Sequence, residues 1–293
     1  MKSGFVNIIG NPNVGKSTLM NALVGERLSI ITAKAQTTRH RIMGIVTGED
    51  YQIVYSDTPG ILTPHYKMQE AMMQFVHTAL VDADVALYVT DVVEQHDKHA
   101  EYISRLQKLK IPLVLVVNKI DLTTPEILEQ QVEQWHAELP QAHIFPTSAL
   151  HKFNLDALFK LLIDLLPEGP AYYDKNQFTD KNLRFFASEI IREKILLHYD
   201  KEIPYSAEVC IDAFEEKTDM YRISGIIYVA RESQKAIVIG HQGKKLTQIG
   251  TAARLDMEQF FEKKVFLQLF VKVNPDWRDD TKQLKKFGYL PNE

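Results

Sequence analysis

The chain has 293 residues and a formal net charge of −4, with 45% hydrophobic and 25% charged residues. This composition is typical of a globular protein and excludes a disordered chain, and the length predicts two domains. No apolar run approaches the ~20 residues of a membrane-spanning helix, and we expect no signal peptide because an apolar run begins at Phe5. The single cysteine, Cys210, cannot form an internal disulfide, so we expect a structural thiol in a cytoplasmic protein.

The first motif is a glycine-rich loop between a predicted strand at residues 5–9 and a predicted helix that begins near residue 17. It matches the pattern G-x-x-x-x-G-K-[ST], whose backbone N–H groups turn toward phosphate oxygens at the start of a helix. We expect Lys16 to neutralise the β- and γ-phosphates and Ser17 to bind Mg²⁺. The predicted contacts of this loop are Asn11, Pro12, Asn13, Val14, Gly15, Lys16, Ser17 and Thr18.

A threonine-rich run at residues 34–40 follows the predicted helix. A mobile loop that completes Mg²⁺ coordination needs a threonine, and we favour Thr38, directly before Arg39, over Thr37. The alternative is a plain threonine-rich edge strand or loop.

The second motif, Asp57-Thr58-Pro59-Gly60, follows a predicted strand at residues 52–55. A carboxylate at the end of a strand beside a phosphate loop suits Mg²⁺, through a water molecule, and the backbone N–H of Gly60 can sense the γ-phosphate. Residues 66–80 then show the apolar spacing of an amphipathic helix, which we expect to move between nucleotide states.

The third and fourth motifs predict recognition of guanine. Asn118, Lys119 and Asp121 follow a uniformly apolar run at residues 111–117, which predicts a central parallel strand. Asp121 can accept hydrogen bonds from N1 and the 2-amino group of guanine, which adenine lacks, while Asn118 can tie loops together and the stem of Lys119 can cover the ring. After a short apolar run at residues 144–146, a backbone N–H of the segment Ser148, Ala149 and Leu150 can reach guanine O6.

The four motifs in this order predict a GTP-binding domain over residues 1–170 that hydrolyses GTP to GDP and phosphate. Many GTPases carry a glutamine after the second motif to orient the attacking water. Here Ile61 occupies that position and cannot hydrogen-bond to water. We therefore expect slow intrinsic hydrolysis unless another group supplies positive charge.

Residues 165–174 interrupt a helical pattern with two prolines and a glycine, which predicts a linker at residues 171–180 before a second domain at residues 181–293. The apolar patterns that follow predict a helix at 185–198, strands at 207–214 and 221–229, helices around a Gly-x-x-Gly loop, and a strand at 265–273. The loop lets backbone N–H groups approach a nucleic-acid backbone, with lysine charge beside it. The predicted RNA contacts are Gly240, His241, Gln242, Gly243, Lys244 and Lys245.

Two further segments are ambiguous. Trp277, Leu284 and the basic residues around them can stack on RNA bases or can cap the small domain. His96 and His99 lie in a polar run without metal-ligand spacing, so we expect them to be solvated.

The phosphate loop, the run Ala35-Gln-Thr-Thr-Arg-His-Arg41 and Asp57–Gly60 resemble the Era family of bacterial GTPases. The resemblance implies a Ras-like α/β domain with a mostly parallel sheet. In related members a hydrophobic residue replaces the glutamine, and the asparagine that corresponds to Asn13 ligates K⁺ in place of an arginine finger. The implied catalytic residues are Lys16, Thr38, Asp57, Gly60 and Asn13, with Ser17, Thr38 and Asp57 on the metal and K⁺ held by Asn13 and the backbone of residues 32–36.

The second half is similar to an α+β KH domain of the type II arrangement, although His241 and Gln242 stand where KH loops usually carry a basic residue. The resemblance implies a monomeric switch that binds small-subunit ribosomal RNA near its 3′ end and assists assembly of the small ribosomal subunit. The formal charge is −6 over residues 1–180 and +2 over residues 181–293, so we expect RNA to bind in a local groove. Two alternatives remain: an RNA-binding module with negligible GTP turnover, and a second domain that binds protein or the inner face of the cell membrane.

Overall fold

The computed structural model describes residues 1–94 and 100–291. His96 and His99 therefore lie outside the described residues. The chain forms two compact units, one comprising Met1–Ser29, Thr38–Pro64 and Gln69–Asp180, and the other comprising Ile30–Thr37, His65–Met68 and Lys181–Glu293. The second unit thus includes two short segments from the first half of the sequence.

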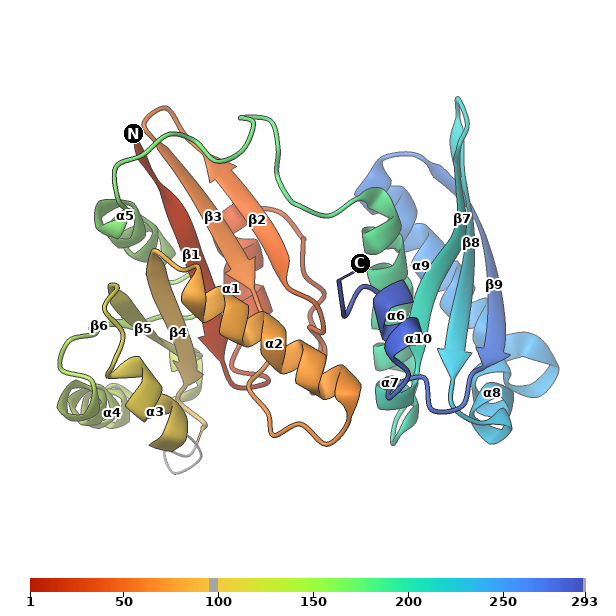
Figure 1. The fold of residues 1–293 in the computed structure, drawn as a ribbon, viewed down its shortest axis with the longest axis horizontal. Coiled ribbons are helices and arrows are strands. Elements are labelled where there is room, and N and C mark those ends of the chain that lie inside the picture. Colours follow the sequence, from red (N-terminus) through yellow and green to blue (C-terminus); the bar gives the residue numbers. More distant parts are fainter. Residues whose placement is uncertain (95–99, 292–293) are drawn as a thin grey trace. The chain divides into compact units, whose positions relative to one another are not determined.

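The first unit is built on a six-stranded sheet with the order β2-β3-β1-β4-β5-β6 (Figure 1). Only β2 runs antiparallel to its neighbour, and the other pairs are parallel. Figure 1 shows α2 in front of the sheet and α1 behind it. The predicted mostly parallel α/β fold is therefore confirmed. The strands are β1 (Lys2–Gly10), β2 (Ile42–Thr47), β3 (Tyr51–Asp57), β4 (Val85–Asp91), β5 (Leu113–Asn118) and β6 (His143–Pro146), and the helices are α1 (Lys16–Val24), α2 (Lys67–Val81), α3 (Ala100–Leu106), α4 (Pro125–Glu138) and α5 (Leu155–Leu165).

Strand register brings the sequence motifs to one edge of this sheet. Ile8 of β1 lies opposite Asp57 of β3, and Asp91 of β4 lies opposite Asn118 of β5. Because the parallel strands end together, the loops that follow them share one edge, where ligands of open α/β sheets bind.

The strand prediction for residues 111–117 needs adjustment at its start. The predicted strand at residues 111–117 begins at Leu113, because Pro112 cannot donate a ladder hydrogen bond. It is buried throughout and pairs in parallel on both sides, as its uniform apolar character predicts. Residues 34–40 form no strand, and the edge strand β2 begins only at Ile42.

The second unit contains a three-stranded sheet in the order β7-β8-β9, with β7 antiparallel and β9 parallel to β8. Helices α6 and α9 pack against each other and against the sheet, and Ile191, Ile195, Ile227 and Met257 lie in the shared core. The predicted order of elements is confirmed. The bounds are α6 (Leu183–His198), α7 (Ile203–Ser206), β7 (Glu208–Glu216), β8 (Met220–Val229), α8 (Glu232–Ile239), α9 (Lys244–Phe261), β9 (Lys264–Val273) and α10 (Thr281–Lys286).

The C-terminal segment caps the second unit. Trp277 is fully buried, its ring lies 5.6 Å from that of Phe287, and its Nε1 donates to the backbone oxygen of Ser206 at 3.1 Å. Leu284 is also fully buried. Of the two alternatives for this segment, the structure shows the capping one, since a buried indole cannot stack on a base.

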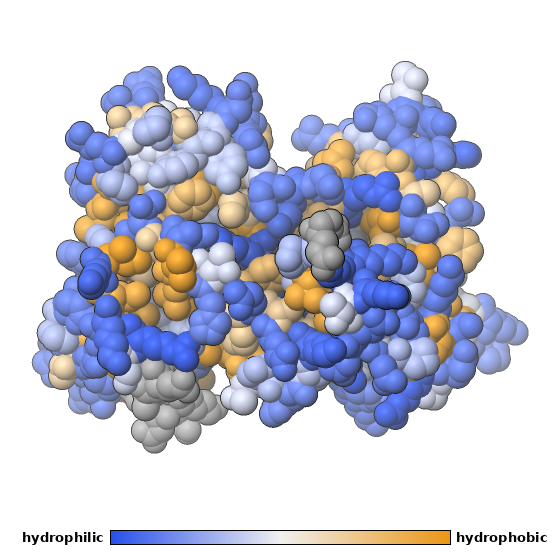
Figure 2. Space-filling model, viewed as in Figure 1, coloured by the Kyte–Doolittle hydropathy of each residue, from blue (hydrophilic) through white to orange (hydrophobic). Residues whose placement is uncertain are grey.

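In the view of Figure 2, hydrophilic residues dominate the surface of each unit and apolar residues are interspersed among them. None of the helices in the described part of the chain combines the length and apolarity needed to cross a membrane. Cys210 is half-buried, and burial raises the pKa of its thiol, which disfavours the reactive thiolate.

Candidate nucleotide site and nucleic-acid interface

The phosphate loop closes around the side chain of Lys16. The residue is 6% exposed, and its ammonium donates to the backbone oxygen of Asn11 at 2.6 Å. Burial lowers the pKa of Lys16 to about 8, although the charges of Asp57 and Glu94 oppose this shift. A buried cation whose ammonium form is disfavoured by burial is well suited to a polyanionic ligand, which would stabilise that charged form.

Two glycines permit close approach of the loops. A Cβ atom on Gly15, whose φ is +95°, would lie 2.2 Å from Nδ2 of Asn118. A Cβ atom on Gly60 would lie 2.7 Å from the backbone nitrogen of Pro12. Glycine at these positions therefore lets the second and third motifs contact the phosphate loop directly.

Ser17, Thr38 and Asp57 form an oxygen cluster at the start of α1. The hydroxyl of Ser17 lies 2.6 Å from Oδ2 of Asp57 and 2.8 Å from Oγ1 of Thr38. Asp57 is fully buried, its Oδ1 has no hydrogen-bond partner among the described residues, and burial raises the pKa of its carboxyl. Hydroxyl and carboxylate oxygens are the ligands that Mg²⁺ prefers, and an orphaned buried carboxylate oxygen is costly without a cation. These residues therefore fit a magnesium ion.

The structure also distinguishes the two threonines of the preceding loop. Thr38 contacts Ser17 and Asp57, whereas the hydroxyl of Thr37 donates to the backbone oxygen of Lys34 at 2.6 Å. The favoured residue, Thr38, is thus the one that lies in the oxygen cluster.

The base-binding motifs meet at the end of β5. Asn118 is buried, and its Oδ1 accepts from the backbone nitrogen of Ala149 at 3.0 Å. Ser148 donates to Asp121 at 2.5 Å, and this hydrogen bond lowers the pKa of the Asp121 carboxyl, so the carboxylate stays ionised and presents acceptors to a ligand. Leu150 is 72% exposed.

Lys119 has a partner that the sequence analysis did not identify. Its ammonium contacts Asp91 at 2.5 Å and the backbone oxygen of Asn13 at 2.6 Å, which fixes the stem of the side chain beside the loop. Asp91 ends the fully buried strand β4. A carboxylate after an apolar run, as at Asp57, is the signal that could have indicated it.

Glu94 is a second site residue that the sequence analysis missed. It accepts from the side chain of Asn11 at 2.5 Å and from Thr90 at 3.2 Å. No spacing rule pointed to it, because it lies in the turn after β4.

The Gly-x-x-Gly loop joins α8 to α9 and has three residues with positive φ. Gly240, Gln242 and Gly243 have φ of +71°, +52° and +76°. His241, Gln242 and Lys244 are exposed, and a Cβ atom added at Gly243 would point into open space. The ammonium of Lys245 lies 5.4 Å from the centre of the Tyr199 ring, so this lysine is partly engaged.

A groove of about 280 Å³ between α9 and β9 lies next to this loop. Leu246, Leu267 and Leu269 give it apolar walls, and Thr247, Thr251 and Arg254 add polar groups. An apolar surface with polar groups around it suits unstacked bases. These residues could not be predicted as a site from the sequence, because they lie on two elements that only the fold brings together.

Comparisons with known proteins agree with this geometry. Residues 5–119 match a family described as 50S ribosome-binding GTPase, and residues 202–278 match the KH domain. GTPase Era of Staphylococcus epidermidis is 44% identical over 294 aligned residues, which cover 100% of this chain and 98% of the relative. GTPase Era of Staphylococcus haemolyticus is 43% identical over the same length. The chain belongs to the Era family of GTPases.

Solved structures of Era share the complete fold. A structure of Era in complex with MgGDPNP and nucleotides 1506–1542 of 16S ribosomal RNA matches with a TM-score of 0.94 and 38% identity over 99% of both chains. A variant of Aquifex aeolicus Era bound to GDP and AlF₄⁻ matches equally well. The expectations of a GTPase with a KH domain, drawn from the sequence, are confirmed, and this Era-family protein hydrolyses GTP.

Proposed function

We propose that this GTPase binds Mg²⁺ and GTP with the motif residues described above. The observation that carries the proposal is the oxygen cluster of Ser17, Thr38 and Asp57 beside the buried Lys16. Bound Mg²⁺ neutralises charge on the phosphate oxygens. Lys16 adds a second positive charge, the backbone of Gly60 senses the γ-phosphate, and Asp121 selects guanine while water attacks in line.

The magnesium set is tested by replacing Asp57 with asparagine, which keeps the size of the side chain and removes its charge. We expect binding of a GTP analogue to become nearly independent of Mg²⁺, with little change in affinity when Mg²⁺ is chelated. Retention of the full Mg²⁺ dependence in Asp57→Asn would refute the assignment.

We further infer that the KH domain binds a single-stranded segment near the 3′ end of small-subunit ribosomal RNA. The complex of Era with nucleotides 1506–1542 of 16S RNA supports this, since that protein is 38% identical along the whole chain. The exposed Gly240–Lys245 loop and the neighbouring groove support it independently. The loop contacts the backbone of four nucleotides and the groove takes their bases.

The structure guides the choice of a test at the loop. Gly240 has φ +71° and ψ 177°, a region accessible almost only to glycine, so a substitution there would strain the backbone. Gly243 has φ +76° and ψ 4° with open space around it, a conformation that aspartate and asparagine tolerate. Gly243→Asp and the isosteric Gly243→Asn therefore differ mainly in charge.

Both variants are compared for binding to an RNA of nucleotides 1506–1542. We expect Gly243→Asp to lose affinity by about tenfold or more through repulsion of phosphates, and Gly243→Asn to stay within about threefold. Equal affinities of the two variants and the unchanged protein would favour the alternative in which the second domain binds protein or a membrane surface.

The role in assembly of the small subunit requires that GTP and RNA influence each other. By linkage, each must change the affinity of the other by the same factor. Measuring GTP-analogue affinity with and without RNA, and RNA affinity with GDP and with the analogue, at one salt concentration, tests this coupling. If neither ligand changed the affinity for the other, the protein would be an RNA-binding GTPase in which nucleotide does not control RNA binding.

We also propose that K⁺ accelerates hydrolysis through Asn13, as the resemblance implies. Support comes from Ile61, which supplies no hydrogen-bonding group after Gly60, and from the exposure of the Asn13 side chain. GTPase rates in potassium and sodium buffers of equal ionic strength test this, with Asn13→Ala as the variant that should lose the difference. Equal rates for the unchanged protein would remove the proposal. Peripheral membrane association and a monomeric state stay predictions.

A further inference from the structure

Arg192 is a fully enclosed charge in the middle of α6. Its residue is 1% exposed, and the guanidinium forms a two-pronged pair with Glu189 on the same helix, at 2.7 Å from Nε and 2.5 Å from Nη2. Glu189 is itself 5% exposed. A buried ion pair repays its desolvation only when additional hydrogen bonds satisfy the remaining donors and acceptors.

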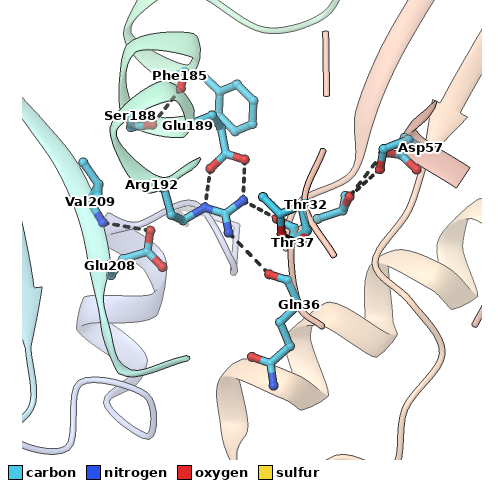
Figure 3. Close-up of polar contacts among 12 residues, drawn as sticks. Thr32, Gln36, Thr37, Asp57, Phe185, Ser188, Glu189, Arg192, Glu208 and Val209 are labelled. Atoms are coloured by element: carbon cyan, nitrogen blue, oxygen red, sulfur yellow. Dashed lines mark hydrogen bonds and ion pairs between the residues drawn. The ribbon is translucent and has the colours of Figure 1, made fainter. Parts of the chain in front are cut away.

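The remaining donors of Arg192 reach two consecutive carbonyl groups of the threonine-rich loop (Figure 3). Nη1 donates to the backbone oxygen of Gln36 at 3.3 Å, and Nη2 donates to that of Thr37. Gln36 has φ +57°, an unfavourable conformation for a residue with a side chain. Such backbone persists when its surroundings hold it, and the guanidinium binds the carbonyl of Gln36 itself and that of the next residue.

The same loop is anchored a second time at the end of α6. The ammonium of Lys34 donates to the backbone oxygen of Tyr199, the C-cap residue of the helix, and contacts Asp200 at 2.9 Å. Residues 30–37 and helix α6 belong to one compact unit. The loop is therefore held within its unit both at Arg192 and at the end of α6.

The residue that follows Thr37 is Thr38, whose hydroxyl lies in the oxygen cluster with Ser17 and Asp57. We propose that Arg192 is a positioning residue for the nucleotide site: by fixing the carbonyls of Gln36 and Thr37, it keeps Thr38 in place to ligate Mg²⁺ beside the γ-phosphate. This inference rests on the proposed role of Thr38. It makes the preference for GTP over GDP depend on a side chain of α6.

The test compares substitutions that separate positioning from folding. Arg192→Lys keeps a charge for Glu189, but a single ammonium cannot span the carboxylate and two carbonyls. The double variant Arg192→Met with Glu189→Met removes both members of the pair together, so neither of these two charges is left without the other. Arg184→Lys is the matched control, because Arg184 lies on the same helix and donates to the carbonyls of Ile211 and Asp212 in β7, at 2.9 and 3.1 Å.

The full-length variants are titrated with GDP and with a non-hydrolysable GTP analogue, each with Mg²⁺ and with EDTA. For both Arg192 variants we expect about a tenfold loss of analogue affinity in Mg²⁺, as for loss of a hydrogen bond to a charged group. GDP affinity should stay within about twofold, because Thr38 is proposed to act only beside the γ-phosphate. Arg184→Lys should leave both affinities and their ratio unchanged.

The proposal would be overturned if correctly folded Arg192 variants lost GDP affinity and analogue affinity equally, or lost neither. It would also be overturned if Arg184→Lys changed the ratio of analogue affinity to GDP affinity as much as the Arg192 variants do. Thr38→Ala separates this failure from failure of the proposed magnesium set. If Thr38→Ala does not weaken the analogue, the role of Thr38 is wrong. If it does and the Arg192 variants do not, only the positioning role is wrong. RNA is absent from these titrations, so their result is independent of RNA binding.

Discussion

The side-chain amide of Asn118 is bonded to the backbone of Val14: its Nδ2 lies 2.8 Å from the Val14 carbonyl oxygen. The same side chain accepts from Ala149 at 3.0 Å, so one buried residue joins the phosphate loop, the end of β5 and the last base-binding motif. A change at Asn118 should therefore affect both ends of a bound nucleotide.

Asn118→Ala removes both hydrogen bonds and leaves the Val14 carbonyl unpaired. We expect GDP affinity to fall by about a hundredfold and the free energy of unfolding to fall by about 2 kcal/mol. Titration with labelled GDP and urea unfolding measure the two effects. Gln107→Ala is the control, since this amide donates to the carbonyl of Glu138 at 2.9 Å away from the motifs and should leave GDP affinity unchanged. An Asn118→Ala protein that is destabilised but binds GDP normally would contradict the joint role.

Asp121→Asn should change which purine is preferred. The amide of asparagine offers a donor in place of an acceptor, so it mismatches the 2-amino group of guanine and matches the 2-oxo group of xanthine. We expect a loss of GTP affinity of ~10²-fold or more and a gain for xanthosine triphosphate. Competition titrations measure the ratio, and Asp121→Ala should lose GTP without gaining the xanthine nucleotide. An unchanged preference in Asp121→Ala would show that guanine is read elsewhere.

Nucleotide binding should depend on pH through Lys16. Its pKa of about 8 lies below the ordinary value because burial disfavours the ammonium. Phosphates favour the charged form, so binding takes up a proton above pH 8 and becomes independent of pH well below it. We expect GDP affinity to fall about threefold from pH 7.5 to 8.5. Calorimetry in two buffers with different ionisation enthalpies detects the proton uptake.

The same pKa has a consequence for folding. The unfolded chain retains its proton up to the ordinary lysine pKa of 10.5, whereas the folded site loses it near 8. The destabilisation from the buried ammonium is therefore fully present below pH 8 and is relieved as the pH rises toward 10.5. Lys16→Arg, which stays charged, should show neither pH effect in whatever binding it retains. If GDP affinity still fell threefold from pH 7.5 to 8.5 in this variant, the titrating group would be one other than Lys16.

Trp277 should matter for the stability of the second unit and not for stacking on RNA. We expect Trp277→Ala to lower the free energy of unfolding by about 3–5 kcal/mol, because a fully buried indole and its hydrogen bond to Ser206 are lost. Trp277→Phe should keep most of the packing and bind RNA as the unchanged protein does. A tenfold loss of RNA affinity in a stable Trp277→Phe protein would argue for direct contact with a base.

The elements that could be predicted from the sequence are those with strong local signals. The uniformly apolar run before Asn118 and the glycine loop before Lys16 predicted a buried strand and a strand–loop–helix unit, and both are present. Strand β2 could not be predicted in this way, because half of its positions are only partly buried and it is an edge strand that pairs on one side. The groove between α9 and β9 could not be predicted either, since its lining residues come from both elements and neither element alone indicates a groove.

The sequence by itself determined the chemistry of the nucleotide site, because the functional groups of each motif lie within a few consecutive residues. It also determined the order of the main elements in the second domain, through apolar periodicity and glycine placement. Only the tertiary structure decided that Thr38 and not Thr37 joins Ser17 and Asp57, that Asp91 and Glu94 belong to the site, and that Arg192 holds the loop before Thr38. The physical reason is that such contacts join residues far apart in the chain, and a local sequence pattern does not predict which distant group a buried charge will contact.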